Sequence, residues 1–311
     1  HWVQGEMLSI GAIAKLSSSS IPIVWTLHDM WAFCGAEHYA EDFRWRDGYN
    51  SDNRPKHERG IDLNRWVWIK KKKWKKMQII TPSRWLADCA KNSALMKDWP
   101  VIHLPNAIDL DFWSPIEKTK AKELLGVSLR KKVILFGAAG GTRDPRKGFD
   151  LLLEALKFAA ERLSKDEVEI LIFGSGDCGF IGEILGIRTR FLGKLSDELS
   201  LKVAYNAADV FVMPSRQDNL PNTVVESLSC GTPVVGFAIG GIPDLVEHKK
   251  NGFIATPFDT QEFGSGISWI LEDRERHINL QIEARRVAVE KLDQTKVAKK
   301  ILALYQSLMR W

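Results

Sequence analysis

The sequence is poor in cysteine and has no long hydrophobic run. Its 311 residues include four cysteines, at positions 34, 89, 178 and 230, without the spacing of a metal or disulfide framework. No apolar stretch approaches the ~20 residues of a membrane span, and no signal peptide is visible. We therefore expect a cytoplasmic protein without a bound metal. A hydrophobic content of 45% suffices for an α/β protein of two domains with separate cores.

The net charge is only +5, but the positive charge is unevenly placed. Residues 65–77, RWVWIKKKKWKKM, hold seven cations among three tryptophans. Lys and Trp on a helix can lie in the interface of an anionic membrane, here the inner face of the plasma membrane. Basic and aromatic residues also suit nucleic acid. A solvated charged face with Trp packed inward is the third interpretation. We expect the first or the third, and no nucleic-acid partner.

The most informative segment is 214–235, PSRQDNLPNTVVESLSCGTPVV. The run 208–215 predicts a buried parallel strand, 223–229 a helix that ends at Cys230-Gly231, and 233–241 a second buried strand. In such βαβ units ligands bind beyond the carboxyl ends of the strands, where Asp218 and Glu226 lie, and the helix start attracts anions. Taken singly, Asp218 fits a turn residue and Glu226 a solvated helix residue.

A second segment, 131–156, predicts a strand, a glycine-rich basic loop and an amphipathic helix. The loop carries Arg143, Arg146 and Lys147, whose charges could neutralise a phosphate that approaches the glycine backbone. A basic loop is also commonly just solvated. The following stretches, 167–177 and 189–215, continue the alternation of strands and helices, so residues 131–275 read as a complete nucleotide-binding half.

These segments resemble the donor site of family-four retaining glycosyltransferases, which have the two-Rossmann GT-B fold. The resemblance implies that Asp218 contacts the donor sugar and Glu226 the ribose hydroxyls, with Asn219 and Leu220 in the same donor loop. The first acid is usually Glu in that family, so Asp218 is a departure. The substrate implied is a nucleoside diphosphate sugar, and the resemblance implies no cofactor.

The same resemblance assigns the basic loop to the donor diphosphate. Lys147, in the Lys-Gly pair, matches the family well, whereas Arg143 and Arg146 compete for the arginine role and we favour Arg143. Phe191-Leu192-Gly193 resembles the segment whose backbone meets the nucleobase, which makes Gly193 a donor-binding residue. Because cations neutralise the diphosphate, no divalent metal is required.

The first hundred residues resemble the other half of the same fold. The predicted strand 21–29 ends in His28, within Thr-Leu-His-Asp-Met-Trp, a close match to a polysaccharide-synthesis branch. A lone His after a strand is more often structural, but the resemblance places His28 against the donor sugar. We therefore expect His28, Asp218 and Lys147 to be catalytic. Glu37, His38 and Tyr39 become acceptor-side candidates for a saccharide or lipid-linked saccharide.

The expected domain boundaries follow from the same comparison. Residues 1–109 are a partial acceptor-side Rossmann-like domain, 110–130 a polar linker, 131–290 the donor domain, and 291–311 a carboxy-terminal helix that crosses back to the first domain. Pro-Asn-Ala-Ile-Asp at 105–109 resembles the family's hinge, with Ala107 in place of the usual Gly. About three βα units of a complete amino-terminal domain are missing, so we expect a truncated chain.

The function implied is retaining transfer of a hexosyl group in cell-surface polysaccharide synthesis. Two alternatives remain. An inactive nucleotide-sugar-binding module would keep the donor residues without turnover. A two-Rossmann epimerase or hydrolase would need an additional acid or base pair, which the sequence does not reveal.

Overall fold

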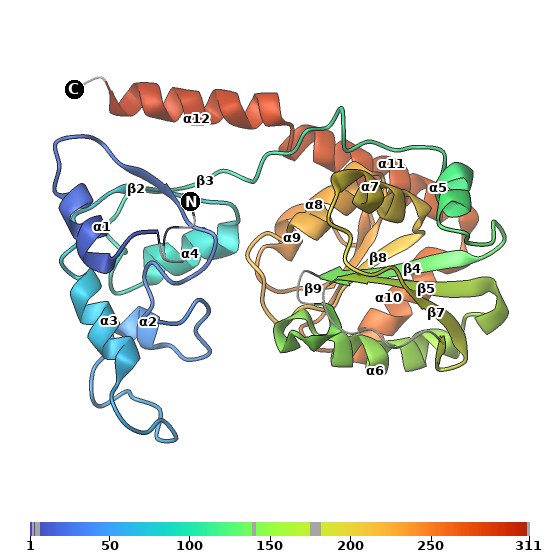
Figure 1. Cartoon of the computed structure of the whole chain (residues 1–311), viewed down its shortest axis with the longest axis horizontal. Helices are drawn as coiled ribbons and strands as arrows, with labels where there is room; N and C mark the ends of the chain where they lie inside the picture. The colour runs from blue at the N-terminus through green and yellow to red at the C-terminus, as the bar shows by residue number, and fades with distance from the viewer. Residues whose placement is uncertain (2, 4–6, 139–140, 175–181, 310–311) are drawn as a thin grey trace. The chain divides into compact units, whose positions relative to one another are not determined.

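The protein folds as two compact units, each with a parallel sheet (Figure 1). The computed structural model describes residues 1, 3, 7–138, 141–174 and 182–309. The first unit comprises His1–Asn106 and Val297–Trp311, and the second comprises Ala107–Lys296. Among the described residues, no helix is both long enough and apolar enough to cross a membrane.

The first unit has a three-stranded sheet in the order β1-β2-β3, with both pairs parallel. Its strands are β1 (Val24–Thr26), β2 (Gln78–Thr81) and β3 (Val101–His103). Its helices are α1 (Ile10–Ser17), α2 (Arg44–Asp47), α3 (Leu63–Lys71), α4 (Arg84–Asn92) and most of α12 (Gln294–Leu308).

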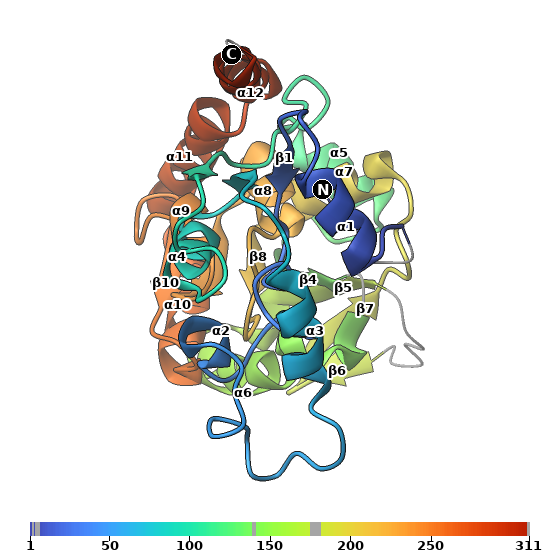
Figure 2. The ribbon, with the colours of Figure 1, turned by 90° about the vertical axis from the view of Figure 1, so that its left-hand side faces the viewer.

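Tryptophan dominates the core of this unit. Trp25, Trp31 and Trp74 are buried and contact one another, with ring centroids 5.6 to 6.4 Å apart. The Trp74 indole N–H donates to the Ile10 carbonyl oxygen at 2.9 Å, because a buried indole needs an acceptor. This bond joins α1 to the segment that follows α3, and the two helices lie side by side in Figure 2.

The second unit is built on a seven-stranded sheet in the order β10-β9-β8-β4-β5-β7-β6, in which only the β6–β7 pair is antiparallel. The strands are β4 (Lys132–Ala138), β5 (Val168–Gly174), β6 (Gly182–Ile184), β7 (Ile187–Phe191), β8 (Val210–Met213), β9 (Val234–Phe237) and β10 (Gly252–Ala255). The helices are α5 (Lys118–Leu124), α6 (Phe149–Ala160), α7 (Glu198–Ala207), α8 (Asn222–Ser229), α9 (Ile242–Leu245), α10 (Thr260–Glu272) and α11 (Arg274–Lys291), with 3₁₀ turns η1 (Gly141–Arg143), η2 (Pro145–Lys147) and η3 (Lys165–Glu167).

Both faces of this sheet are covered, which is why its strands are continuous apolar runs. Since side chains alternate along a strand, Val133 and Leu135 point to one face of β4 and Ile134 and Phe136 to the other. Helices α7, α8, α9 and α11 cover the first face, and α6 and α10 cover the second (Figure 1).

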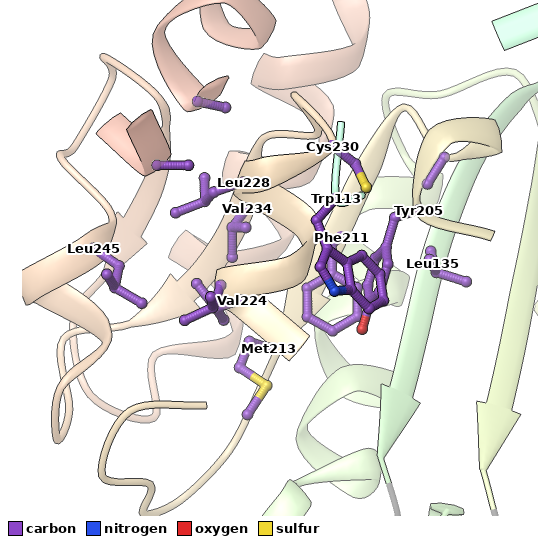
Figure 3. Close-up of a cluster of buried hydrophobic side chains, with 14 of the residues drawn as sticks. Trp113, Leu135, Tyr205, Phe211, Met213, Val224, Leu228, Cys230, Val234 and Leu245 are labelled. Carbon is purple, nitrogen blue, oxygen red and sulfur yellow. The ribbon is translucent and has the colours of Figure 1, made fainter. Parts of the chain in front are cut away.

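The hydrophobic cluster on the first face is shown in Figure 3. Tyr205 from α7 packs edge-on against Phe211 of β8 and against Trp113, at centroid distances of 5.5 and 6.1 Å. Trp113 belongs to the segment that follows the Pro-Asn-Ala-Ile-Asp sequence. The core of the second unit therefore includes residues that precede its first strand.

The stretch 110–130 differs from its expected role as a linker, because it folds with the second unit. Helix α5 packs through Ala121 against Val203 and Ala207 of α7. Lys118 and Lys122, which suggested a solvated stretch, both donate to the Asp209 carboxylate, at 2.7 and 3.1 Å. Their partner lies about ninety residues further along the chain, so local composition could not reveal it.

Candidate functional site

The sheet of the second unit brings two predicted residues together. Lys147 follows β4 and Asp218 follows β8, and these strands are parallel neighbours, so both residues emerge at the carboxyl edge. The Lys147 ammonium donates to Asp218 Oδ2 at 2.5 Å. Asp218 is buried, with 9% of its surface exposed. Lys147, predicted to bind the diphosphate, therefore contacts Asp218, predicted to bind the sugar.

Two glycines allow the backbone to pack closely around Asp218, one against Pro214 and one against Asp218 itself. Gly148 has φ +67°, and a Cβ there would lie 2.0 Å from the Pro214 carbonyl oxygen at the end of β8. Gly240 has φ +52°, and a Cβ there would lie 1.8 Å from the Asp218 carbonyl oxygen. Only glycine tolerates both the backbone angle and the contact. The Lys-Gly pair is thus explained by the close packing of two loops.

Arg216 clamps the same two loops and was not predicted from the sequence. Its guanidinium donates to both oxygens of the Asp150 carboxylate, at 2.8 and 2.6 Å, and to the Pro145 carbonyl oxygen at 2.8 Å. Its backbone N–H donates to the Arg146 carbonyl oxygen at 2.7 Å. This forked geometry fixes orientation as well as distance. Arg216 therefore holds the loop that carries Lys147 against the loop that carries Asp218.

Glu226 lies on α8 and accepts a hydrogen bond from the buried Tyr205 hydroxyl at 2.8 Å. Burial raises the pKa of Glu226 to about 7, because the charged carboxylate loses water. Helix α8 has no side-chain cap and no acid in its first turn. Its amino end therefore presents the positive pole of the helix dipole, which favours an anion.

Glu226 lines a pocket of about 340 Å³ within the second unit. Asn222 and Glu226 stand one helical turn apart on α8 and so share a face. The Arg285 guanidinium supports the opposite wall, donating to the carbonyl oxygens of Leu110, Trp113 and Ser229 at 2.6 to 2.9 Å. The lining residues are Ala107, Ile108, Asp109, Phe112, Trp113, Glu198, Asn222, Val225 and Glu226.

The remaining residues predicted for the donor side occupy the loops around this edge. Asn219 and Leu220 are buried directly after Asp218. Gly193 has φ +75° at the end of β7, and its carbonyl oxygen accepts from the Gly174 N–H at 3.0 Å. Arg143 is exposed at the end of η1, whereas the Arg146 guanidinium pairs with Asp144 at 3.0 Å. Residues 139–140 and 175–176 of the glycine-rich loops lie outside the described residues.

In the first unit, His28 follows β1 as predicted. A hydrogen bond of 2.9 Å joins its Nε2 to the His1 Nδ1, and the two rings stack. Burial and the positive amino terminus lower the pKa of His28. His38 Nδ1 donates to the buried Asp29 carboxylate at 2.7 Å, and the Met30 N–H donates to the His38 carbonyl oxygen at 2.9 Å. The segment between Asp29 and His38 is therefore a closed loop.

The other acceptor-side candidates, Glu37 and Tyr39, contact aromatic side chains of the first unit. Glu37 accepts a short hydrogen bond from the Tyr49 hydroxyl, and Tyr39 stacks on Trp85 with centroids 6.4 Å apart. The fully buried Lys71 ammonium donates to the carbonyl oxygens of Trp31, Cys34 and Gly35. Burial lowers the pKa of Lys71 to about 7. The Lys71 ammonium thus holds three backbone carbonyl groups of this loop together.

No three His, Cys, Asp or Glu side chains in the described parts of the chain are grouped as a metal site would require. Cys34, Cys89 and Cys230 are buried thiols. Tyr205, Arg216 and Arg285 are the functional candidates that the sequence did not reveal, since each acts through a partner distant in the chain. Arg216 alone offered a local signal, as a cation two residues before Asp218.

Comparison with known proteins finds sequence similarity over the second unit. The profile of the family described as glycosyl transferases group 1 matches residues 131–273. An uncharacterized glycosyltransferase of Methanocaldococcus jannaschii is 30% identical over 202 residues, 62% of this chain and 49% of that protein. The chain thus spans about half the length of this curated relative.

Solved structures agree at the level of the fold. Sucrose-phosphate synthase of Thermosynechococcus elongatus has a TM-score of 0.71 at 20% identity, covering 94% of this chain and 69% of that one. Anabaena HepE in complex with UDP-glucose has a TM-score of 0.69 at 21% identity, covering 96% and 77%. The expected α/β fold of GT-B type is confirmed, and residues 131–273 are similar to the glycosyl transferases group 1 family.

Proposed function

We propose that this chain carries the donor site of a retaining glycosyltransferase of family four. It would move a hexosyl group from a nucleoside diphosphate sugar to a saccharide or lipid-linked saccharide in cell-surface polysaccharide synthesis. The observation that carries the proposal is the 2.5 Å contact between Lys147 and Asp218 beside the uncapped start of α8. Both residues belong to the matched glycosyl transferases group 1 domain.

The central chemical difficulty is charge, because a diphosphate departs while the sugar becomes cationic. Lys147, Arg143 and the amino end of α8 would neutralise the diphosphate. Asp218 forms an ion pair with Lys147. The diphosphate of a bound donor would accept hydrogen bonds from the same Lys147 ammonium, either together with Asp218 or in its place. The carboxylate is then left beside the sugar, where it can accept hydrogen bonds from hydroxyl groups.

The rest of the donor would be held by residues around the same edge. Glu226 would accept hydrogen bonds from the ribose hydroxyls, and the Gly193 backbone would meet the nucleobase. Asn219 and Leu220 would shape the sugar pocket. In the first unit, His28 is the residue proposed for the sugar side, and Glu37, His38 and Tyr39 remain the proposed acceptor side.

The proposed transfer keeps the configuration at the anomeric carbon. The bond between that carbon and the diphosphate oxygen breaks, and its electron pair stays on the leaving oxygen. The acceptor hydroxyl oxygen bonds to the same face of the carbon, and its proton passes to the departing phosphate. No protein carboxylate has to act as a nucleophile in this scheme. Asp218 would instead stabilise the positive charge on the sugar.

The relatives suggest which donor to try first. The Anabaena structure contains UDP-glucose, and the Thermosynechococcus structure is named a sucrose-phosphate synthase. A UDP-hexose is therefore the first candidate donor for this chain.

The surface of α3 supports peripheral association with an anionic membrane, which we place at the cytoplasmic face. Leu63, Trp66 and Ile69 are exposed, at 54%, 53% and 46%, and recur at helical spacing. The Lys70 ammonium lies 3.4 Å from the centre of the Trp66 ring. An exposed apolar stripe beside lysines suits the interface of an anionic bilayer. Trp68, by contrast, is buried.

Hydrolysis of UDP-α-glucose in the absence of acceptor tests the enzymatic proposal, because water can replace the acceptor. Proton NMR would follow the first glucose released. The proposal predicts α-glucose first, with turnover lost in Lys147→Ala and kept in Lys157→Ala, a matched exposed lysine. Release of β-glucose first would exclude retention. Binding without any turnover, with or without added saccharides, would favour an inactive binding module.

A further inference from the structure

A second recess in the second unit lies at the opposite edge of the sheet from Lys147 and Asp218. Its volume is about 610 Å³. It is lined by the start of β4, by α5, by Asp209 just before β8, and by the end of α10 and the start of α11. Because β4 has seven residues, roughly 20 Å separate the two edges. We call this feature the basic recess.

The inner wall of the basic recess has more positive than negative charge. Asp209 is its buried acid, and the carboxylate accepts from Lys118, from Lys122 and from the Val133 N–H at 2.7 to 3.1 Å. One carboxylate therefore faces two ammonium groups. His277 Nε2 donates to the Asp209 carbonyl oxygen at 2.7 Å. These contacts hold the wall together. Two lysine ammonium groups against one carboxylate leave one excess positive charge.

The rim adds cations without acids. Arg130, Lys131, Lys132 and Arg274 line the recess, and none of them pairs with an acid in the part of the chain that the structure describes. The other lining acid, Glu272, pairs with Arg162 at 3.1 Å. Among the residues that line the recess, the uncompensated charge is therefore positive.

A concave surface lined by charge of one sign concentrates the electrostatic potential and attracts an oppositely charged ligand. Arginine and lysine are the donors that recognise phosphate oxygens. Helix α11 starts at Arg274 and is capped by Asp273, with Glu275 in its first turn, and neither of these acids lines the recess. We propose that the basic recess binds a small, multiply charged phosphate-bearing anion at a site separate from the donor pocket.

The shape favours a soluble small molecule over a membrane surface. Lys122 and Asp209 lie at the bottom of the recess with little exposure, at 7% and 12% of their side chains. A flat bilayer would reach only Arg130, Lys131 and Arg274 on the rim. A compact anion can reach the buried ammonium groups as well. The proposal does not depend on the transferase activity, since it concerns the other edge of the sheet.

Calorimetric titration of sodium pyrophosphate into the full chain tests this assignment. The chain carries Lys147→Ala, so that the donor-side lysine does not contribute. We expect saturable 1:1 binding that weakens at least tenfold on adding Lys131→Ser and Arg274→Ser. The control adds Lys299→Ser and Lys300→Ser on α12, an equal change of charge on exposed lysines, and should stay within twofold. Thermal unfolding would verify that all variants are folded.

Three results would overturn the proposal. The first is an absence of saturable binding to the Lys147→Ala chain, which would make the recess a solvated charged surface. The second is equal weakening by the recess pair and the α12 pair, which would indicate general electrostatic attraction. The third is binding only to phosphatidylglycerol vesicles, lost with the recess pair, which would assign the cations to a lipid headgroup. None of these outcomes bears on whether a nucleotide sugar binds the intact donor edge.

Discussion

Glu226 is a half-buried acid whose protonation should control nucleotide binding. Its pKa near 7 means that much of it is protonated at neutral pH, whereas ribose hydroxyls would donate best to the carboxylate. Nucleotide binding should therefore release protons near pH 7. We predict that the affinity for UDP rises between pH 6 and pH 8, and that Glu226→Gln has a weaker affinity that does not vary with pH through this group.

The same shift has a consequence for folding. A raised pKa in the folded state stabilises the fold below the unfolded value of about 4.5, and this contribution is lost as pH rises through 7. The free energy of unfolding of the wild type should fall relative to Glu226→Gln by about 2–3 kcal/mol between pH 4.5 and pH 8. Denaturant titrations at the two pH values measure this. An unchanged difference would mean that Glu226 is not desolvated.

Gly148 provides a further prediction. Its positive φ and the Pro214 carbonyl oxygen leave no room for a Cβ. Gly148→Ala should cost about 2 kcal/mol or more and weaken nucleotide binding, since the Lys147 loop must move. Gly126→Ala is the control, because Gly126 also has a positive φ but its Cβ would meet only the Arg190 tip at 3.8 Å. It should cost about 1 kcal/mol and leave binding intact.

The sequence predicted the motif residues but not the side chains that hold them in place. Lys147, Asp218 and Glu226 stand in recognisable local patterns, and the structure brings the first two into contact. Tyr205 and Arg285 carry no such pattern. Tyr205 matters because α7 packs it beside Glu226, and Arg285 because α11 returns to the loop at 110–113. Such roles depend on tertiary packing.

At the scale of elements, the clamp between the loops after β4 and β8 makes a separate prediction. Asp150 is 65% exposed in its side chain, so the ion pair with Arg216 should add less than about 1 kcal/mol to stability. Its effect should instead be on the position of Lys147. Arg216→Lys and Asp150→Asn should each weaken nucleotide binding about three- to tenfold by calorimetry, with little change in unfolding temperature.

The double variant Arg216→Lys/Asp150→Asn should resemble either single variant, because both remove the same contact. Arg286→Lys is the matched control, since Arg286 pairs with Glu290 at 2.6 Å on the exposed face of α11. Additive losses in the double variant, or an equal loss in the control, would show that the clamp does not position the loop.

The exposed stripe of α3 gives another prediction. Trp66→Ser/Ile69→Ser should lower co-sedimentation with phosphatidylglycerol vesicles at least fivefold, and added salt should lower the binding of the wild type. Ile282→Ser/Val289→Ser removes a comparable exposed apolar pair from α11 and should have no effect. Wild-type sedimentation that is equal with neutral phosphatidylcholine vesicles would argue against recognition of anionic lipid.

The alternation of strands and helices was predictable because buried parallel strands are continuous apolar runs bounded by Gly and Pro. The hairpin of β6 and β7 was not predicted. Its turn places Leu185 at φ +56° before Gly186, whereas sequence signals for such turns rely on Asn or Asp before Gly. Ala107 stands where the family's hinge usually has Gly. It is not among the described residues with positive φ, so the hinge sequence needs no glycine there.

In the whole molecule, the chain divides into two units between the last strand of the first sheet and the first strand of the second. The boundary falls between Asn106 and Ala107, and most of α12 groups with the first unit. Residues 107–130 look like a linker by composition, yet Lys118 and Lys122 are tied to Asp209 and Trp113 enters the second core. The second unit therefore contains the complete wall of the Glu226 pocket.

We propose that the second unit binds a nucleoside diphosphate sugar through Lys147 and the surrounding carboxyl edge of its sheet. Calorimetric titration of UDP, GDP and ADP, and of their common sugars, into this chain tests it most directly. We predict selective binding of one nucleotide, weakened at least tenfold in Lys147→Ala and unchanged in the exposed-lysine control Lys157→Ala. No binding of any nucleotide, or equal affinity in Lys147→Ala and wild type, would contradict the account.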